Sequence, residues 1–226
     1  MILGLALTLI TFALAVKLAK IKYFKKLPPI IVAGIVIMAI LRTCHISYDD
    51  YNQSASFLTF LLGPGTIALA YPLITNKEIL TQNKRAIWFG LLFATLTAMI
   101  STYLIGKIFH VNFNIIMSLI PKSVTTPIAV EISKHIGGIP ELTACVVVIT
   151  GIVGALFGHR VLKFAKIKHD IAIGLSMGAS SHVMGTAKCI EKKQTKQAAI
   201  SSLALIMVGI FTTVISYIFA YFHFGR

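Results

Sequence analysis

Apolar residues in this chain come in long blocks, each close to the ~20 residues that a helix needs to cross a bilayer. Short polar or basic segments, such as residues 45–56, separate the blocks, so the pattern predicts an all-α, polytopic membrane protein. The blocks that resemble full spans are residues 2–16, 28–44, 57–74, 86–108, 140–158 and 198–222. We expect residues 1–226 to form a single integral membrane domain, because the blocks leave no room for a sizeable soluble one.

A secretory signal peptide is the alternative interpretation of the first block. A signal peptide carries its positive charge before the apolar core and a small-residue cleavage site after it. Here the lysines follow the core, within residues 17–26, and no cleavage pattern appears. We therefore expect a retained first span with the N-terminus outside.

Two further segments differ from ordinary spans. Residues 112–135 are only moderately apolar and contain two prolines, and residues 171–187 are short and rich in glycine and serine. Either both segments cross the membrane, or each enters it and returns to the same face. The second choice gives about six transmembrane helices plus two opposed re-entrant or broken-helix elements, as in inverted-repeat transporters. Direct evidence for an inverted repeat is limited to a short match between residues 62–67 and 119–124.

Composition and charge support the membrane interpretation. The chain is 57% hydrophobic and 12% charged, whereas soluble domains carry about a quarter charged residues. Its net charge of +14 would suggest nucleic acid in a soluble chain. Sixteen of the 21 Lys and Arg residues instead lie in four loops, residues 17–26, 77–85, 160–168 and 188–196. The arrangement with two re-entrant elements puts these loops on one face, so the positive-inside rule favours it, with both termini outside and no nucleic-acid partner.

Polar residues at the expected helix breaks form the candidate site. Backbone groups freed by a broken helix cost several kcal/mol in hydrocarbon unless they face protein or a wet cavity. Hydroxyls there either repair the backbone or bind a ligand, and the sequence leaves both open. A charge at the bilayer centre costs at least ~2.5 kcal/mol, so Lys122 and Glu131 are either interfacial or functional. His182 is either a neutral side chain bonded to a backbone carbonyl or a proton carrier, since histidine changes charge between about pH 5 and 8.

The expected site residues fall into three groups. Those expected to bind a substrate are Lys122, Ser123, Thr125, Thr126, Ser180, Ser181, His182 and Thr186. Those expected to carry a coupling proton are His182 and Glu131. The helix-breaking positions are Gly63, Pro64, Gly65, Pro121, Pro127, Gly178 and Gly185.

Signatures of enzymes and metal sites do not occur in the sequence. There is no HExxH, GxSxG, Walker A or GxGxxG pattern, so we expect neither an enzyme nor a cofactor. Cys44, Cys145 and Cys189 are isolated from one another, and we expect buried free thiols rather than disulfides or a metal site.

Five short blocks carry a resemblance to a known family. PKSVTTPIA at residues 121–129 resembles the LrgB/CidB family of bacterial membrane proteins. In the same order as in that family, further similar blocks are LLGPGTIALAYPL at residues 61–73, IGGIP at 136–140, TGIVG at 150–154 and SHVMGTA at 181–187. The resemblance implies a multi-pass protein of the bacterial cytoplasmic membrane. It also implies an antiholin-like or holin-like modulator of murein hydrolase activity and autolysis, with a smaller LrgA/CidA-like membrane partner.

The resemblance implies transport as well. A plant plastid relative exports glycolate and imports glycerate, and bacterial members are linked to pyruvate uptake. Basic and hydroxyl groups at helix breaks suit such small carboxylates. The first hypothesis is therefore a small-carboxylate transporter linked to autolysis, and the alternative is a regulatory subunit that restrains a holin-like partner without transport of its own. The sequence leaves open the substrate, the coupling ion and a homodimer.

Overall fold

The structure is a computed structural model, and it describes residues 3–21, 29–61, 64 and 77–224. Throughout these ranges the regular structure is α-helical, without a β-strand. The chain forms two compact units, residues 1–68 and residues 69–226. The expectation of a single integral domain stays a prediction.

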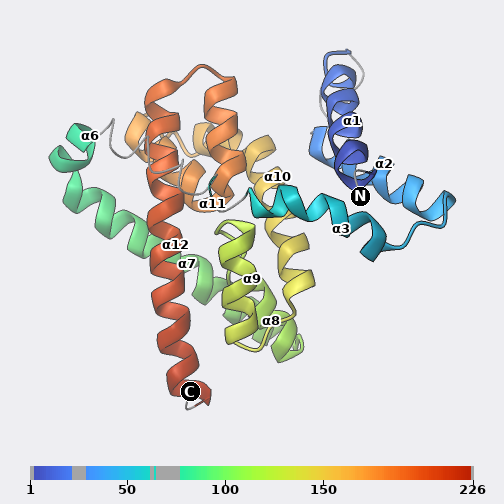
Figure 1. Cartoon of the computed structure of the whole chain (residues 1–226). Helices are drawn as coiled ribbons and strands as arrows, with labels where there is room; N and C mark the ends of the chain where they lie inside the picture. Colours follow the sequence, from blue (N-terminus) through green and yellow to red (C-terminus); the bar gives the residue numbers. More distant parts are fainter. Residues whose placement is uncertain (1–2, 22–28, 62–63, 65–76, 225–226) are drawn as a thin grey trace. The chain divides into compact units, whose positions relative to one another are not determined.

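The first unit contains three helices, α1 (Leu3–Leu18), α2 (Pro29–Thr43) and α3 (Tyr48–Phe60) (Figure 1). Helix α1 packs against both α2 and α3. Its contact with α3 is close because Gly4 has no side chain, and a Cβ there would lie 2.1 Å from the carbonyl oxygen of Tyr51. The hydroxyls of Thr8 and Tyr51 lie 2.8 Å apart and add a hydrogen bond to the same contact.

Helix α3 differs from the sequence pattern, which predicts a polar connection over residues 45–56. The structure has a helix there because its start carries strong capping signals. The Ser47 hydroxyl accepts a hydrogen bond from the backbone N–H of Asp50 at 3.1 Å. Asp49 and Asp50 lie in the first turn, where negative charge is favourable. Capping thus forms a helix where hydrophobicity alone predicts none.

The second unit is built around its longest helix, α12, which packs against α7, α9 and α11 (Figure 1). Its described helices are α6 (Lys77–Gln82), α7 (Lys84–Ile108), α8 (Phe113–Leu119), α9 (Thr126–His135), α10 (Pro140–Phe164), α11 (Asp170–Glu191) and α12 (Thr195–Phe224). Half of the apolar window of α12 is buried (50%), compared with 28% in α7 and 22% in α10. The apolar side chains that α7 and α10 leave exposed are typical of helices that face lipid.

Three of the predicted spans are confirmed in length and composition. Helices α7 and α10 and residues Thr195–Phe222 of α12 are long and apolar enough to cross a membrane. Helices α1 and α2 are apolar but have 16 and 15 residues, roughly 22 to 24 Å, which is shorter than the ~30 Å hydrocarbon core. Most of the span expected at residues 57–74 lies outside the described residues. Six spans and an inverted repeat therefore stay predictions.

Candidate functional site

The first expected helix break separates α8 from α9. The backbone leaves the helical conformation after Ile120 and returns to it at Thr126, with Thr125 as the N-cap of α9 in an extended conformation. Pro127 occupies the first turn of α9, where its missing N–H leaves no unpaired group. Helices of 7 and 10 residues are about 10 and 15 Å long, so neither α8 nor α9 can cross ~30 Å of hydrocarbon alone.

A buried hydroxyl cluster joins the ends of α8 and α9 to the start of α10. Ser118, Ser133 and Thr143 are all fully buried. The Thr143 hydroxyl lies 2.7 Å from the Ser133 hydroxyl and 3.0 Å from the Ser118 carbonyl oxygen. The Ser118 hydroxyl accepts a hydrogen bond from the backbone N–H of Ile139 at 2.7 Å. Gly138 permits this approach, since a Cβ there would lie 2.4 Å from the Ser133 hydroxyl.

Lys122 and its neighbours lie in the α8–α9 break. The half-buried Lys122 ammonium donates a hydrogen bond to the Thr102 hydroxyl on α7. Ser123 and Thr125 are buried, and Thr126 is half-buried. The Thr125 hydroxyl is buried and has no hydrogen-bond partner among the described residues, although an N-cap hydroxyl usually accepts from the first turn of its helix. Glu131 is exposed and pairs with Lys134 at 2.7 Å, so the geometry does not join it to Lys122.

The second expected break lies at His182, inside α11. His182 has φ +41° and ψ −131°, a conformation that L residues rarely adopt. The two halves of α11 fold back on each other and come very close at Gly185, where a Cβ would lie 2.2 Å from the Met177 carbonyl oxygen. In a straight helix these residues would be about 12 Å apart. Gly178 and Gly185 are helical and flank the break, which is at the histidine itself.

Glycines on α10 allow the break in α11 to approach closely. His182 is 5% exposed, and its Nε2 lies 2.9 Å from the Val147 carbonyl oxygen. A Cβ at Gly151 would lie 2.5 Å from the imidazole Cε1, and one at Gly154 would lie 2.6 Å from the Ser181 Cβ. Of the two alternatives for His182, the hydrogen bond to a backbone carbonyl is the one present in this conformation.

The register of α9 and α10 brings the two breaks to the same level. These helices follow each other through a short turn and pack together, and the hydrogen bond between Thr143 and Ser133 aligns them. Gly151 lies eight residues after Thr143 in α10, and Thr125, the N-cap of α9, lies eight residues before Ser133. His182, which contacts Gly151, therefore lies at the same level of α10 as Thr125.

Contacts with α12 also place the two breaks near each other, independently of the contacts with α10. Gly209 faces the Ile128 side chain of α9, 3.3 Å from a built Cβ. Ser201 meets both halves of α11. Its carbonyl oxygen lies 2.2 Å from a Cβ built on Gly178, and its hydroxyl lies 2.8 Å from that of Thr186. Both breaks thus lie along residues 201–209 of α12, a stretch about 12 Å long.

The expected site residues differ in how deeply they are buried. Ser181, His182 and Thr186 are buried, whereas Ser180 is exposed and donates to the Ser176 carbonyl oxygen. Glu131 lies on the exposed side of α9 with Lys134. Two expected helix-breaking positions, Gly63 and Gly65, lie outside the described residues, and Pro64 is described without its neighbours. Within the described ranges no group of three or more His, Cys, Asp or Glu side chains is arranged to hold a metal ion.

Sequence reasoning missed the hydroxyl cluster of Ser118, Ser133 and Thr143. The available signal was Gly137-Gly138 ahead of Pro140, because paired glycines before a helix allow close backbone approach. It also missed Thr102 as the partner of Lys122, since 20 residues separate the two in sequence.

Comparison with known proteins gives consistent matches over most of the chain. The model of the LrgB-like family matches residues 8–222. The chain is 32% identical to the antiholin-like protein LrgB of Bacillus subtilis over 217 residues, covering 96% of this chain and 94% of the relative. It is 30% identical to the holin-like protein CidB of Staphylococcus aureus over 189 residues, covering 84% and 82%. An uncharacterized protein of Haemophilus influenzae is 35% identical over 93% of this chain and 90% of its own length. No solved structure matches the chain significantly.

Proposed function

Because the chain belongs to the LrgB-like family, we propose that it is a small-carboxylate transporter of the bacterial cytoplasmic membrane that also acts in the control of murein hydrolases and autolysis. The transported anions are of the pyruvate, glycolate or glycerate type. The protein spans the membrane several times with both termini outside. Its membrane partner is a smaller LrgA/CidA-like protein, and a homodimer is a second assembly open to it.

The proposal rests on polar groups at the α8–α9 break whose hydrogen-bonding capacity is not filled within the described residues. In the part of the chain that the structure describes, the Thr125 hydroxyl is buried without a hydrogen-bond partner, at the N-terminus of a ten-residue helix. Within the described residues the nearby Lys122 ammonium has a hydroxyl partner and no carboxylate. A carboxylate accepts hydrogen bonds from ammonium, hydroxyl and helix N-terminal N–H groups together. Lys122, Ser123, Thr125 and Thr126 would supply these donors.

The second break would complete the binding site from the opposite side. Ser180, Ser181, His182 and Thr186 belong to it, and the common level of the two breaks along α10 supports their acting together. A coupling proton would be carried by His182, which can exchange its hydrogen bond to the Val147 carbonyl for one to the substrate. Glu131 is the alternative proton carrier, working from the exposed side of α9.

Flux measurements in proteoliposomes test the proposal directly. Purified protein, with and without its smaller partner, should give saturable uptake of pyruvate, glycolate or glycerate. Lys122→Ala should raise the half-saturation concentration about tenfold or more, since a charge-assisted hydrogen bond contributes roughly 1.5–3 kcal/mol. Lys163→Ala is the matched control, because that lysine is exposed in the last turn of α10 and is not one of the proposed site residues. Absence of saturable flux for all three anions would count decisively against transport.

A regulatory role without transport is the second candidate. It is favoured by the similarity to an antiholin-like and a holin-like protein over most of the chain. In that case the protein restrains a holin-like partner through its loops and exposed helix faces. Lys122→Ala, Ser123→Ala and His182→Ala variants that retain full control of autolysis would favour this role, whereas loss of control together with loss of flux would favour transport.

A further inference from the structure

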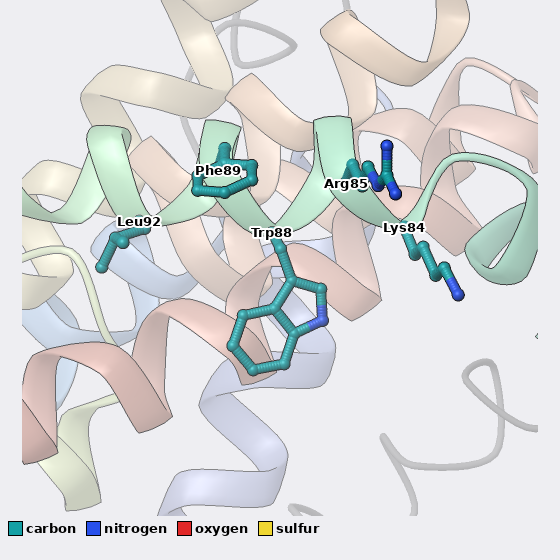
Figure 2. A pocket seen from close by; sticks show the side chains of 5 residues that line it. All are labelled: Lys84, Arg85, Trp88, Phe89 and Leu92. Atoms are coloured by element: carbon teal, nitrogen blue, oxygen red, sulfur yellow. The ribbon is translucent and has the colours of Figure 1, made fainter.

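An open hollow of about 330 Å³ lies at the start of α7, away from the residues discussed so far (Figure 2). Its lining residues are Lys84, Arg85, Trp88, Phe89 and Leu92. They follow an order along the helix, with two cations in the first turn, two aromatic rings in the second and a leucine in the third. The residue types thus change from basic to aliphatic over eight residues, about 12 Å, while the surface of the hollow itself is almost wholly apolar, since Lys84 and Arg85 line it with their aliphatic stems.

The two cations at the mouth of the hollow are not neutralised within the described part of the chain. Lys84 and Arg85 are both exposed, and neither forms an ion pair there. The first turn of α7 contains no acidic residue, and the N-terminus of a helix adds partial positive charge. This end of α7 therefore carries two positive charges that have no ion-pair partner among the described residues.

Trp88 is held in position at the centre of the hollow. Its ring meets Phe211 of α12 edge-on, with 5.3 Å between centroids, yet 55% of the residue is exposed. In Figure 2 the indole nitrogen lies on the edge of the ring toward Lys84. A tryptophan with a fixed apolar edge and an N–H without a hydrogen-bond partner in the described ranges suits the boundary between headgroups and hydrocarbon.

We propose that this hollow binds an anionic phospholipid of the surrounding membrane. Lys84 and Arg85 hold the headgroup phosphate, for which the arginine fork provides two parallel donors. The Trp88 N–H reaches the ester level, and the acyl chain lies along Phe89 and Leu92. Trp88 is about 6 Å from Lys84 along the helix axis, which matches the roughly 5–8 Å depth of the interfacial region on each face of a bilayer. The proposal requires that α7 crosses the membrane, and it does not depend on carboxylate transport.

Lipid binding at the hollow can be followed by tryptophan fluorescence, since Trp88 is the single tryptophan of the chain. The full-length protein is reconstituted in phosphatidylcholine vesicles that contain a small fixed fraction of a lipid with brominated acyl chains, which quench indole fluorescence on contact. Brominated phosphatidylglycerol should quench Trp88 as if it were enriched about thirtyfold at the site, given two attracting cations at roughly 1 kcal/mol each. Brominated phosphatidylcholine at the same fraction should quench only in proportion to its amount.

Variants that remove positive charge then test whether Lys84 and Arg85 cause the preference for the anionic lipid. Lys84→Gln/Arg85→Gln should abolish the difference between the two brominated lipids. Lys192→Gln/Lys193→Gln is the matched control, because these lysines are also exposed and adjacent but have no aromatic neighbour in sequence. The control should keep the full preference.

Three results would overturn the proposal. One is equal quenching by the two brominated lipids, and another is an unchanged preference in Lys84→Gln/Arg85→Gln protein. The third is loss of the preference on addition of inorganic phosphate at constant ionic strength, which would identify a site for a soluble anion. Quenching requires no solute flux, so the lipid site and the carboxylate site succeed or fail separately.

Discussion

Replacing Gly151 by alanine is expected to disrupt the contact between α10 and the break in α11. A Cβ at Gly151 would lie 2.5 Å from Cε1 and 2.7 Å from Nε2 of His182, closer than van der Waals contact allows. The imidazole is buried, so it can move away only by losing its 2.9 Å hydrogen bond to the Val147 carbonyl. Met184 Cγ is also close, at 2.9 Å, but belongs to a flexible side chain.

Three contributions set the size of the effect. Loss of the hydrogen bond costs about 1 kcal/mol, and forcing a methyl group into a packed contact costs about 1–3 kcal/mol. The better helix propensity of alanine offsets about 1 kcal/mol of this. The expected net loss in the free energy of unfolding is about 1–3 kcal/mol, or roughly 3–10 °C in Tm for a chain of this length.

Cys189 provides the assay, because its thiol is fully buried. The expectation of burial was wrong for Cys44 and Cys145, whose side chains are exposed. In a Cys44→Ser/Cys145→Ser background, a thiol-reactive fluorescent dye should report unfolding of the detergent-solubilised protein as Cys189 becomes accessible on heating. Gly90→Ala is the control, since a Cβ at Gly90 meets no atom of the described residues within 4 Å. It should leave the Tm unchanged or raise it slightly.

A double-mutant comparison shows whether His182 is the cause. In a His182→Ala background the imidazole is gone, so Gly151→Ala should cost at least 1 kcal/mol less than in the native background. If Gly151→Ala is as stable as Gly90→Ala, or if its cost is the same with and without the imidazole, the close contact between α10 and α11 is refuted.

Three further predictions concern the same unit. Thr143→Val should lower stability by about 1–3 kcal/mol because it leaves the buried Ser133 hydroxyl without its partner, while Thr143→Ser should cost much less; equal melting temperatures would contradict this. His182→Gly should be about 1 kcal/mol more stable than His182→Ala, since only glycine adopts a φ of +41° without strain, and thermal melting of both variants decides it. Burial raises the pKa of the Cys189 thiol, an effect that the Lys192 charge partly opposes. In the Cys44→Ser/Cys145→Ser background, the infrared S–H stretching band of Cys189 should therefore persist to a pH about one unit above 8.5, where an ordinary thiol has lost most of its protons; loss of the band with a midpoint at or below about pH 8.5 would disprove the shift.

The sequence predicts those parts of the fold that depend on local pattern. Apolar block length predicts α7, α10 and α12, because crossing hydrocarbon requires about 20 apolar residues in a row. Proline and glycine spacing predicts that residues 112–135 and 171–187 are interrupted, as both are. The hydrophobic pattern does not predict α3, because the start of this helix depends on one serine hydroxyl and two aspartates rather than on apolar content.

The candidate site is less predictable because its contacts join residues distant in sequence. The sequence singles out Lys122 and His182, but not their partners Thr102 and Val147, which lie 20 and 35 residues away. The TGIVG block contains Gly151, yet only the fold shows that its missing side chain makes room for an imidazole. Pairing of this kind depends on helix packing, which local periodicity does not determine.

The ten residues of α9 have an electrical consequence. A helix about 15 Å long covers half of a ~30 Å hydrocarbon core. When its C-terminal end lies at the membrane surface, its N-terminal end lies near mid-depth. A monovalent ion held there has passed through about half of the transmembrane voltage, worth roughly 1 kcal/mol per 100 mV. The resting potential would then change the apparent affinity for the ion several-fold, with opposite sign for ions arriving from the two sides. The length of α9 would thus set the fraction of the membrane potential that a bound ion experiences.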